Sequence, residues 1–229
     1  MPASSMRGSR RTGFAHAPGL AHHFEDRVQQ HEAARLGTWV FLATEVMFFG
    51  GMFTGYTVYR NLYPLAFSLA SRHLEVSLGT ASTVVLIGSS LTMALAIRAA
   101  QVGRWRLQIG YLIATMLLGS MFLVVKGIEY HYTWVDHLMP GPGFDVAAFG
   151  LEGPRARIFY SFYFVMTGVH AFHVVVGLGI LAWITRRAAR GDFIPAHHTA
   201  LGMSGHYWHF VDVVWIFLFP LLYLIGRHG

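Results

Sequence analysis

Five long apolar stretches constrain the fold of this 229-residue chain more than any other feature. They run over residues 36–59, 76–97, 107–125, 158–184 and 207–225. A helix of about 20 apolar residues crosses the hydrocarbon core of a bilayer, because each residue adds about 1.5 Å. The apolar residues are continuous rather than alternating, which favours helices over barrel strands. We therefore predict an all-α, polytopic membrane protein, built as a five-helix transmembrane bundle.

The composition agrees with this prediction and narrows the chemistry. Charged residues make up 12% of the chain, whereas soluble domains contain roughly 25%. The chain contains no cysteine, which excludes disulfides, thiolate metal sites and cysteine nucleophiles. Its net charge of +6 comes almost wholly from arginine. In a membrane protein such an excess marks cytoplasmic loops and anionic headgroups, and it does not indicate a nucleic-acid partner.

The chain divides into a polar N-terminal arm, residues 1–35, and a five-helix transmembrane domain, residues 36–229. Arginines are concentrated in the arm and in the second and fourth connections between the apolar stretches. Short cytoplasmic segments of membrane proteins carry most of the Lys and Arg. We therefore expect a cytoplasmic N-terminus and an external C-terminus.

One carboxylate, Glu45, lies inside the first apolar stretch, roughly 14 Å from its start at 1.5 Å per residue. An ionisable group at that depth is costly in lipid, so it faces protein or water and is a functional-site hypothesis by default. The structural alternative is a protonated glutamic acid that is hydrogen-bonded inside the bundle. The functional alternative is an independent proton transporter that uses Glu45.

Two pairs of histidines could in principle ligate haem or a metal. His170 and His173 share one face of the fourth stretch, and His206 and His209 repeat the three-residue spacing in the fifth. A haem needs ligands at matched depth on facing helices. The first pair is predicted at mid-helix and the second near the membrane boundary. We therefore expect the histidines to bond backbone groups, each other or headgroups, with a b-type cytochrome as the alternative.

Three more ionisable side chains fall in or beside the apolar stretches. Lys126 and Glu129 lie three residues apart, and we expect an ion pair that anchors the third helix at the membrane interface. Asp212, a few residues into the fifth stretch, should be partnered by a neighbouring helix or a water-filled niche. The sequence shows neither a nucleophile with its base nor a phosphate-binding loop. We predict no catalytic residue and no metal site in this chain.

Three longer motifs resemble subunit III of haem–copper cytochrome c oxidases. They are WVFLATEVMFFGG from Trp39, IFYSFYFVMTGVHAFHVVVG from Ile158 and YWHFVDVVW from Tyr207. The shorter runs GSSLT from Gly88 and KGIEY from Lys126 are similar to weaker family motifs. The resemblance extends over nearly the whole chain from residue 36 onward. It is closest to the five-helix bacterial form, which lacks the first two of the seven helices of the long form.

The resemblance implies a subunit of a bacterial cytoplasmic (inner) membrane oxidase that carries no haem or copper itself. Such a subunit packs against subunit I. Subunit II and other oxidase subunits belong to the same complex, and a larger respiratory supercomplex is a further candidate partner. The subunit holds phospholipid and sustains proton uptake. Glu45 falls on the family's buried, carbodiimide-reactive carboxylate, and Arg187 and His197 fall on positions that contact lipid headgroups. An accessory subunit of nitric oxide reductase is the alternative, and the electron donor, cytochrome c or quinol, stays open.

Overall fold

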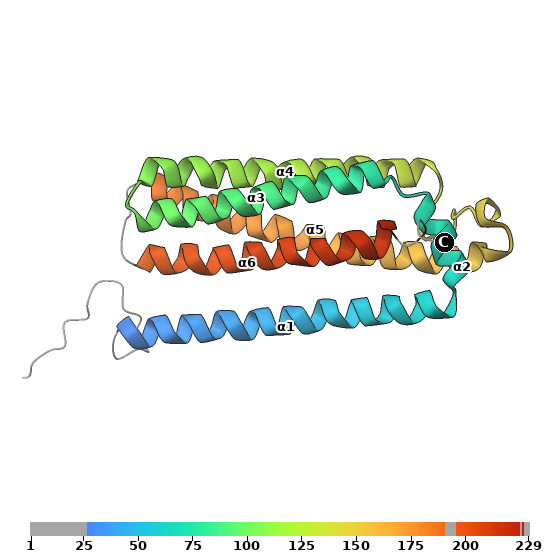
Figure 1. The fold of residues 1–229 in the computed structure, drawn as a ribbon, viewed down its shortest axis with the longest axis horizontal. Helices are drawn as coiled ribbons and strands as arrows, with labels where there is room; N and C mark the ends of the chain where they lie inside the picture. Colours follow the sequence, from blue (N-terminus) through green and yellow to red (C-terminus); the bar gives the residue numbers. More distant parts are fainter. Residues whose placement is uncertain (1–26, 191–195, 225, 227–229) are drawn as a thin grey trace, which may run out of the picture.

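The computed structural model describes residues 27–190, 196–224 and 226, which form a bundle of long helices (Figure 1). Five of the described helices are long and apolar enough to cross a membrane, which confirms the predicted all-α, multi-pass fold. They are α1 (Arg27–Leu62), α3 (Val76–Gln101), α4 (Trp105–Val135), α5 (Gly153–Ala189) and α6 (Ala196–Phe219). Three short elements lie at one end of the bundle: α2 (Pro64–Arg72), the 3-10 helix η1 (Ala147–Glu152) and the π-helical turn η2 (Pro220–Leu224).

The helices extend beyond the apolar stretches that predicted them. α4 continues to Val135 and α5 begins at Gly153, so the connection between them is shorter than the gap between the apolar stretches 107–125 and 158–184. The short helix α2 was not predicted from the sequence. Pro64 ends α1 and starts α2 in its first turn, where the missing N–H of proline is not needed. α1 begins at Arg27, within the predicted arm, and residues 1–26 lie outside the described part of the chain.

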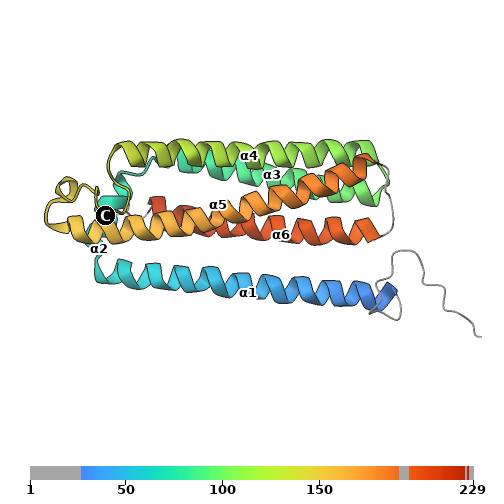
Figure 2. The ribbon, with the colours of Figure 1, turned by 180° about the vertical axis from the view of Figure 1, so that it is seen from behind.

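The helices α3, α4, α5 and α6 form the compact part of the bundle, and α1 runs beside α5 and α6 (Figures 1 and 2). The turn from α3 to α4 is set by Gly103, whose φ of 73° is a conformation that glycine adopts without strain. The N–H of Gly103 donates to the carbonyl of Ala100 at 3.0 Å, and that of Arg104 to Ala99 at 2.9 Å. These two hydrogen bonds close the end of α3 as a Schellman motif.

α1 is attached to the bundle by a small number of specific contacts. The fully buried Tyr56 donates its hydroxyl hydrogen to the carbonyl of Leu221 in η2 at 2.6 Å. Halfway along α1, the Phe49 ring packs edge-on against Phe210 of α6. The opposite side of α1 exposes apolar side chains, among them Met47. That side therefore faces lipid or another apolar chain in the membrane.

Trp208 of α6 lies at the centre of the bundle and is 1% exposed. Its indole N–H donates to Ser89 Oγ of α3 at 3.1 Å. The ring fits between α4 and α5 because Gly119 and Gly177 carry no side chain there. A Cβ added at Gly119 or Gly177 would lie 2.8 or 2.9 Å from the ring. Small residues therefore allow the close helix approach that membrane bundles need.

We expect Gly177→Ala to destabilise the subunit by about 1–3 kcal/mol, because the new methyl group overpacks the Trp208 ring. Gly179→Ala on the same helix is the matched control, since a Cβ at that position meets nothing within 4 Å. The measurement is the unfolding midpoint of the purified protein in rising dodecyl sulfate. Identical midpoints for the two variants would contradict the packing described for Trp208.

Candidate functional site

Three contacts made by Lys, Glu and His side chains inside the described bundle join different helices. The first is an ion pair within α4 that is bonded to tyrosines of α5 and η2, the second links α1 to α5, and the third links α6 to α3. All three lie within helices that are long and apolar enough to cross a membrane.

The ion pair of Lys126 and Glu129 is buried, with each residue 3% exposed. Lys126 Nζ donates to Glu129 Oε2 at 2.8 Å and to the Tyr223 hydroxyl at 2.6 Å. The other carboxylate oxygen, Oε1, accepts hydrogen bonds from Tyr163 at 2.9 Å and from Tyr223. We call these four residues the Lys126 cluster. It contains donors and an acceptor from α4, α5 and η2, so it fastens the three elements together.

Aromatic rings surround the ammonium group of Lys126. Its Nζ lies 4.9 Å from the Trp215 ring centroid and 5.3 Å from those of Tyr163 and Tyr223, distances typical of cation–π contacts. The expected ion pair is confirmed, and its role as an anchor at the membrane interface stays a prediction. α4 continues past Glu129 to Val135, so the pair lies inside the helix rather than at its end. No sequence signal had pointed to the two tyrosines.

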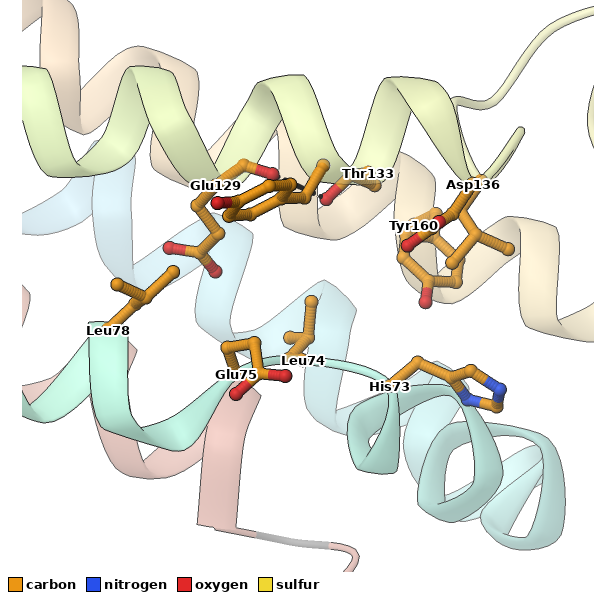
Figure 3. A pocket seen from close by; sticks show the side chains of 10 residues that line it. His73, Leu74, Glu75, Leu78, Glu129, Thr133, Asp136 and Tyr160 are labelled. Carbon is orange, nitrogen blue, oxygen red and sulfur yellow. Dashed lines mark hydrogen bonds between the residues drawn. The ribbon is translucent and has the colours of Figure 1, made fainter.

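Glu129 also lines a cavity of about 510 Å³ at the α2 end of the bundle (Figure 3). The exposed residues His73, Glu75 and Asp136 line the same cavity. In Figure 3 the Glu129 carboxylate points into the space between α3 and α4, toward Leu78. The cavity therefore extends from the surface of this chain to the Lys126 cluster.

Glu45 lies against His173 of α5, a partner that the sequence analysis did not identify. Glu45 Oε2 and His173 Nε2 are 3.0 Å apart, and the side chains are 17% and 12% exposed. His173 Nδ1 lies 2.8 Å from the carbonyl oxygen of Val169. Because a carbonyl only accepts, Nδ1 carries a hydrogen and donates it. The contact between Nε2 and Oε2 then holds one proton, which links α1 to α5 at mid-helix.

His209 of α6 contacts α3. Its Nδ1 is 2.6 Å from Ser90 Oγ, in the middle of α3. The neighbouring Tyr207 donates its hydroxyl hydrogen to the backbone carbonyl of His173 at 3.0 Å. α6 begins at Ala196, well before the apolar stretch that was read from the sequence, so His206 and His209 lie within the helix rather than at its start. The predicted difference in membrane depth between the two histidine pairs stays a prediction.

His170 has a different environment from the other histidines of the bundle. His170 is fully buried between the rings of Phe122 and Trp215, at centroid distances of 5.4 and 5.2 Å. Neither of its ring nitrogens has a hydrogen-bond partner among the described residues. Within the part of the chain that the structure describes, no three His, Asp or Glu side chains converge in a way that could hold a metal ion.

The remaining predicted site residues are Asp212, Arg187 and His197. Asp212 is 4% exposed and lies beside Ser90, yet neither carboxyl oxygen has a hydrogen-bond partner among the described residues. Arg187, in the last turn of α5, places its guanidinium 5.0 Å from the ring centroid of Trp183. The side chain of His197 lies outside the described part of the structure.

Comparison with known proteins identifies the family. Residues 20–227 match the family model of cytochrome c oxidase subunit III. Cytochrome c oxidase subunit 3 of Corynebacterium diphtheriae is 34% identical over 198 residues, which cover 83% of this chain and 87% of the relative. The same subunit of Thermostichus vulcanus is 31% identical over 204 residues (88% and 92%), and quinol oxidase subunit 3 of Bacillus subtilis is 30% identical over 203 residues (87% and 92%). The chain therefore belongs to the cytochrome c oxidase subunit III family.

Proposed function

We propose that this chain is the non-redox subunit III of a bacterial terminal oxidase, where it stabilises subunit I, holds phospholipid and sustains proton uptake. The observation that carries the proposal is the use of its intramembrane polar groups. The Lys126 cluster, the Glu45–His173 contact and the Ser90–His209 contact each join one helix to another. Groups committed to helix–helix links support a scaffold rather than an electron-transfer centre of its own.

The end of α5 supports the lipid-binding part of the proposal. Arg186 and Arg187 lie in its last turn, and Arg187 lies over Trp183, a residue type enriched at the membrane interface. Each basic residue near anionic headgroups contributes about 1 kcal/mol to binding. We therefore assign Arg187, together with His197, to a phospholipid phosphate on the cytoplasmic side of the membrane.

The partners of the proposal are subunit I in direct contact, subunit II and other oxidase subunits. The relatives include subunits of both cytochrome c oxidases and quinol oxidases, so the proposal covers either electron donor. We place the N-terminus in the cytoplasm and the C-terminus outside, from the distribution of arginines.

An affinity tag on this chain should recover the other oxidase subunits in mild detergent, together with their haem and copper. After the complex is dissociated, the separated chain should be colourless, because its histidines are expected to serve as helix contacts. The measurement is the metal and haem content of the separated chain. Stoichiometric haem or copper in that fraction would contradict the non-redox role, and a tag that recovers no oxidase subunit would contradict the proposal as a whole.

Glu45→Gln should leave oxidase turnover within about twofold of normal, because a glutamine amide can replace the one hydrogen bond to His173 Nε2. Glu45→Leu is the matched comparison, since leucine leaves Nε2 without its partner and should weaken the attachment of α1. Turnover of the assembled complex is measured with its native electron donor. If Glu45→Gln abolishes turnover in a fully assembled complex, Glu45 carries protons that are essential to catalysis, and the scaffold role assigned to it is wrong.

A further inference from the structure

α6 runs between α1 and α3 on one face of the bundle (Figure 1). Its outward side chains recur every three or four residues, as one side of a helix does. We call them the α6 face: His206, His209, Val213, Ile216 and Pro220. Val213 and Ile216 are 47% and 48% exposed in this chain. The α6 face is therefore an uncovered strip that runs along the middle of the membrane-spanning part.

A polar group lies within this strip, far from either end of α6. The Nδ1 atom of the half-buried His209 is engaged with Ser90, whereas its Nε2 has no hydrogen-bond partner among the described residues. His206 likewise uses Nδ1, which donates to the carbonyl of Gly202 at 2.7 Å. Lipid tails offer no hydrogen bond, so polar groups at this depth face protein or water. The α6 face is unsuited to contact with lipid alone.

The outward side of α4 provides the contrast. Around mid-helix its exposed residues include the apolar Leu117, Met121 and Val124, and the one polar side chain among them is the small hydroxyl of Ser120. A serine hydroxyl in a helix can bond a backbone carbonyl of its own preceding turn, so lipid tails can cover this side. α4 and α1 lie at opposite edges of the bundle in Figures 1 and 2. The outward side of α4 is therefore suited to contact with lipid, whereas the α6 face needs a partner that can form a hydrogen bond.

We propose that the α6 face docks against a transmembrane helix of a neighbouring oxidase subunit, and that a hydroxyl, amide or carboxyl group of this helix bonds His209 Nε2. The apolar Val213 and Ile216 provide packing next to the polar contact. Polar side chains that bond across helices are the usual way in which transmembrane helices fix their partner and register. The inference rests on the proposed function, because it names the surface through which this subunit joins its complex.

Site-specific photo-crosslinking in the intact oxidase tests the surface. A benzophenone amino acid replaces Val213 or Ile216 in separate variants, and Leu117, 67% exposed on α4, is the control position. We expect adducts with another oxidase subunit from at least one α6 position, identified by mass spectrometry. If neither α6 position gives such an adduct, the proposed docking surface is wrong.

Two substitutions at His209 test the hydrogen bond itself. Glutamine places its amide near the position of Nε2, whereas asparagine places its amide near Nδ1 and keeps only the contact with Ser90. We expect His209→Asn to leave the complex about 3-fold to 10-fold faster than the native subunit in detergent, as for loss of one interhelical hydrogen bond. His209→Gln should be retained nearly as the native subunit is. Equal release of the two variants, or faster release of His209→Gln, would contradict the proposed hydrogen bond between His209 Nε2 and the partner helix.

The tests separate this inference from the proposed function. If the tagged chain recovers no oxidase subunit, the proposed function fails and the complex needed for crosslinking does not exist. If the chain recovers oxidase subunits but neither α6 position crosslinks to them, the subunit assignment stands and the α6 face is not its docking surface.

Discussion

Lys126→Leu should destabilise this subunit by about 3–5 kcal/mol, because it leaves the Glu129 carboxylate buried without its counter-charge. Each residue of the pair is 3% exposed, so the remaining charge keeps little contact with water, even though Glu129 borders the cavity at the α2 end. The hydroxyls of Tyr163 and Tyr223 remain beside Glu129, but they bring no charge. Glu129→Leu should have an effect of the same size, since it leaves the ammonium group among aromatic rings.

A second ion pair in the same chain is the matched control. Arg155 and Glu152 are also three residues apart and joined at 2.8 Å, but their side chains are 50% and 18% exposed. Pairs of this kind are typically worth less than about 1 kcal/mol, so Arg155→Leu should be nearly neutral. The measurement is the unfolding midpoint of each purified variant in rising dodecyl sulfate. Indistinguishable midpoints for Lys126→Leu and Arg155→Leu would contradict the structure of the Lys126 cluster.

The double variant Lys126→Leu with Glu129→Leu distinguishes charge from shape. Buried ion pairs replaced by apolar residues are often neutral, because the cost of burying two charges disappears with them. The double variant should therefore recover most of the stability lost in either single variant. A loss equal to the sum of the two single losses would mean that packing, rather than the unpaired charge, dominates.

The fold was predictable from sequence because its main signal is local. Continuous apolar stretches of bilayer length permit little besides transmembrane helices, and the motifs around Glu45 and Trp208 identified the family. The predicted ends of the helices were less accurate. α6 starts at Ala196, but the His, Gly and Ser residues that follow lower the local hydropathy, so the first turns of α6 were not predicted as part of the helix.

The contacts of the candidate site could not be read from spacing. His173 meets Glu45 only because α1 packs beside α5, and the two residues are 128 positions apart in the chain. The spacing of Lys126 and Glu129 did predict their ion pair, but their depth depended on where α4 ends. Tyr223 reaches them from the turn that follows Pro220, which no helix periodicity describes.

Removal of the whole subunit is expected to shorten the working life of the oxidase far more than it lowers the initial rate. The chain is proposed to carry no redox group, so electron transfer in the partner subunits can start without it. Its proposed contributions are helix packing, retention of phospholipid and supply of protons to subunit I. Losing them should let the catalytic subunit inactivate while it turns over, and an enzyme that is not turning over should keep its activity for longer.

The most direct measurement is the oxygen-consumption time course of the oxidase purified with and without this chain, followed until activity is lost. We predict similar or modestly lower initial rates without the subunit, followed by progressive inactivation, and a restored lifetime when the purified subunit is added back. An unchanged lifetime after complete removal of the subunit would contradict the proposed function. So would an immediate and complete loss of activity from an otherwise intact complex, because that result would place an essential part of the reaction in this chain.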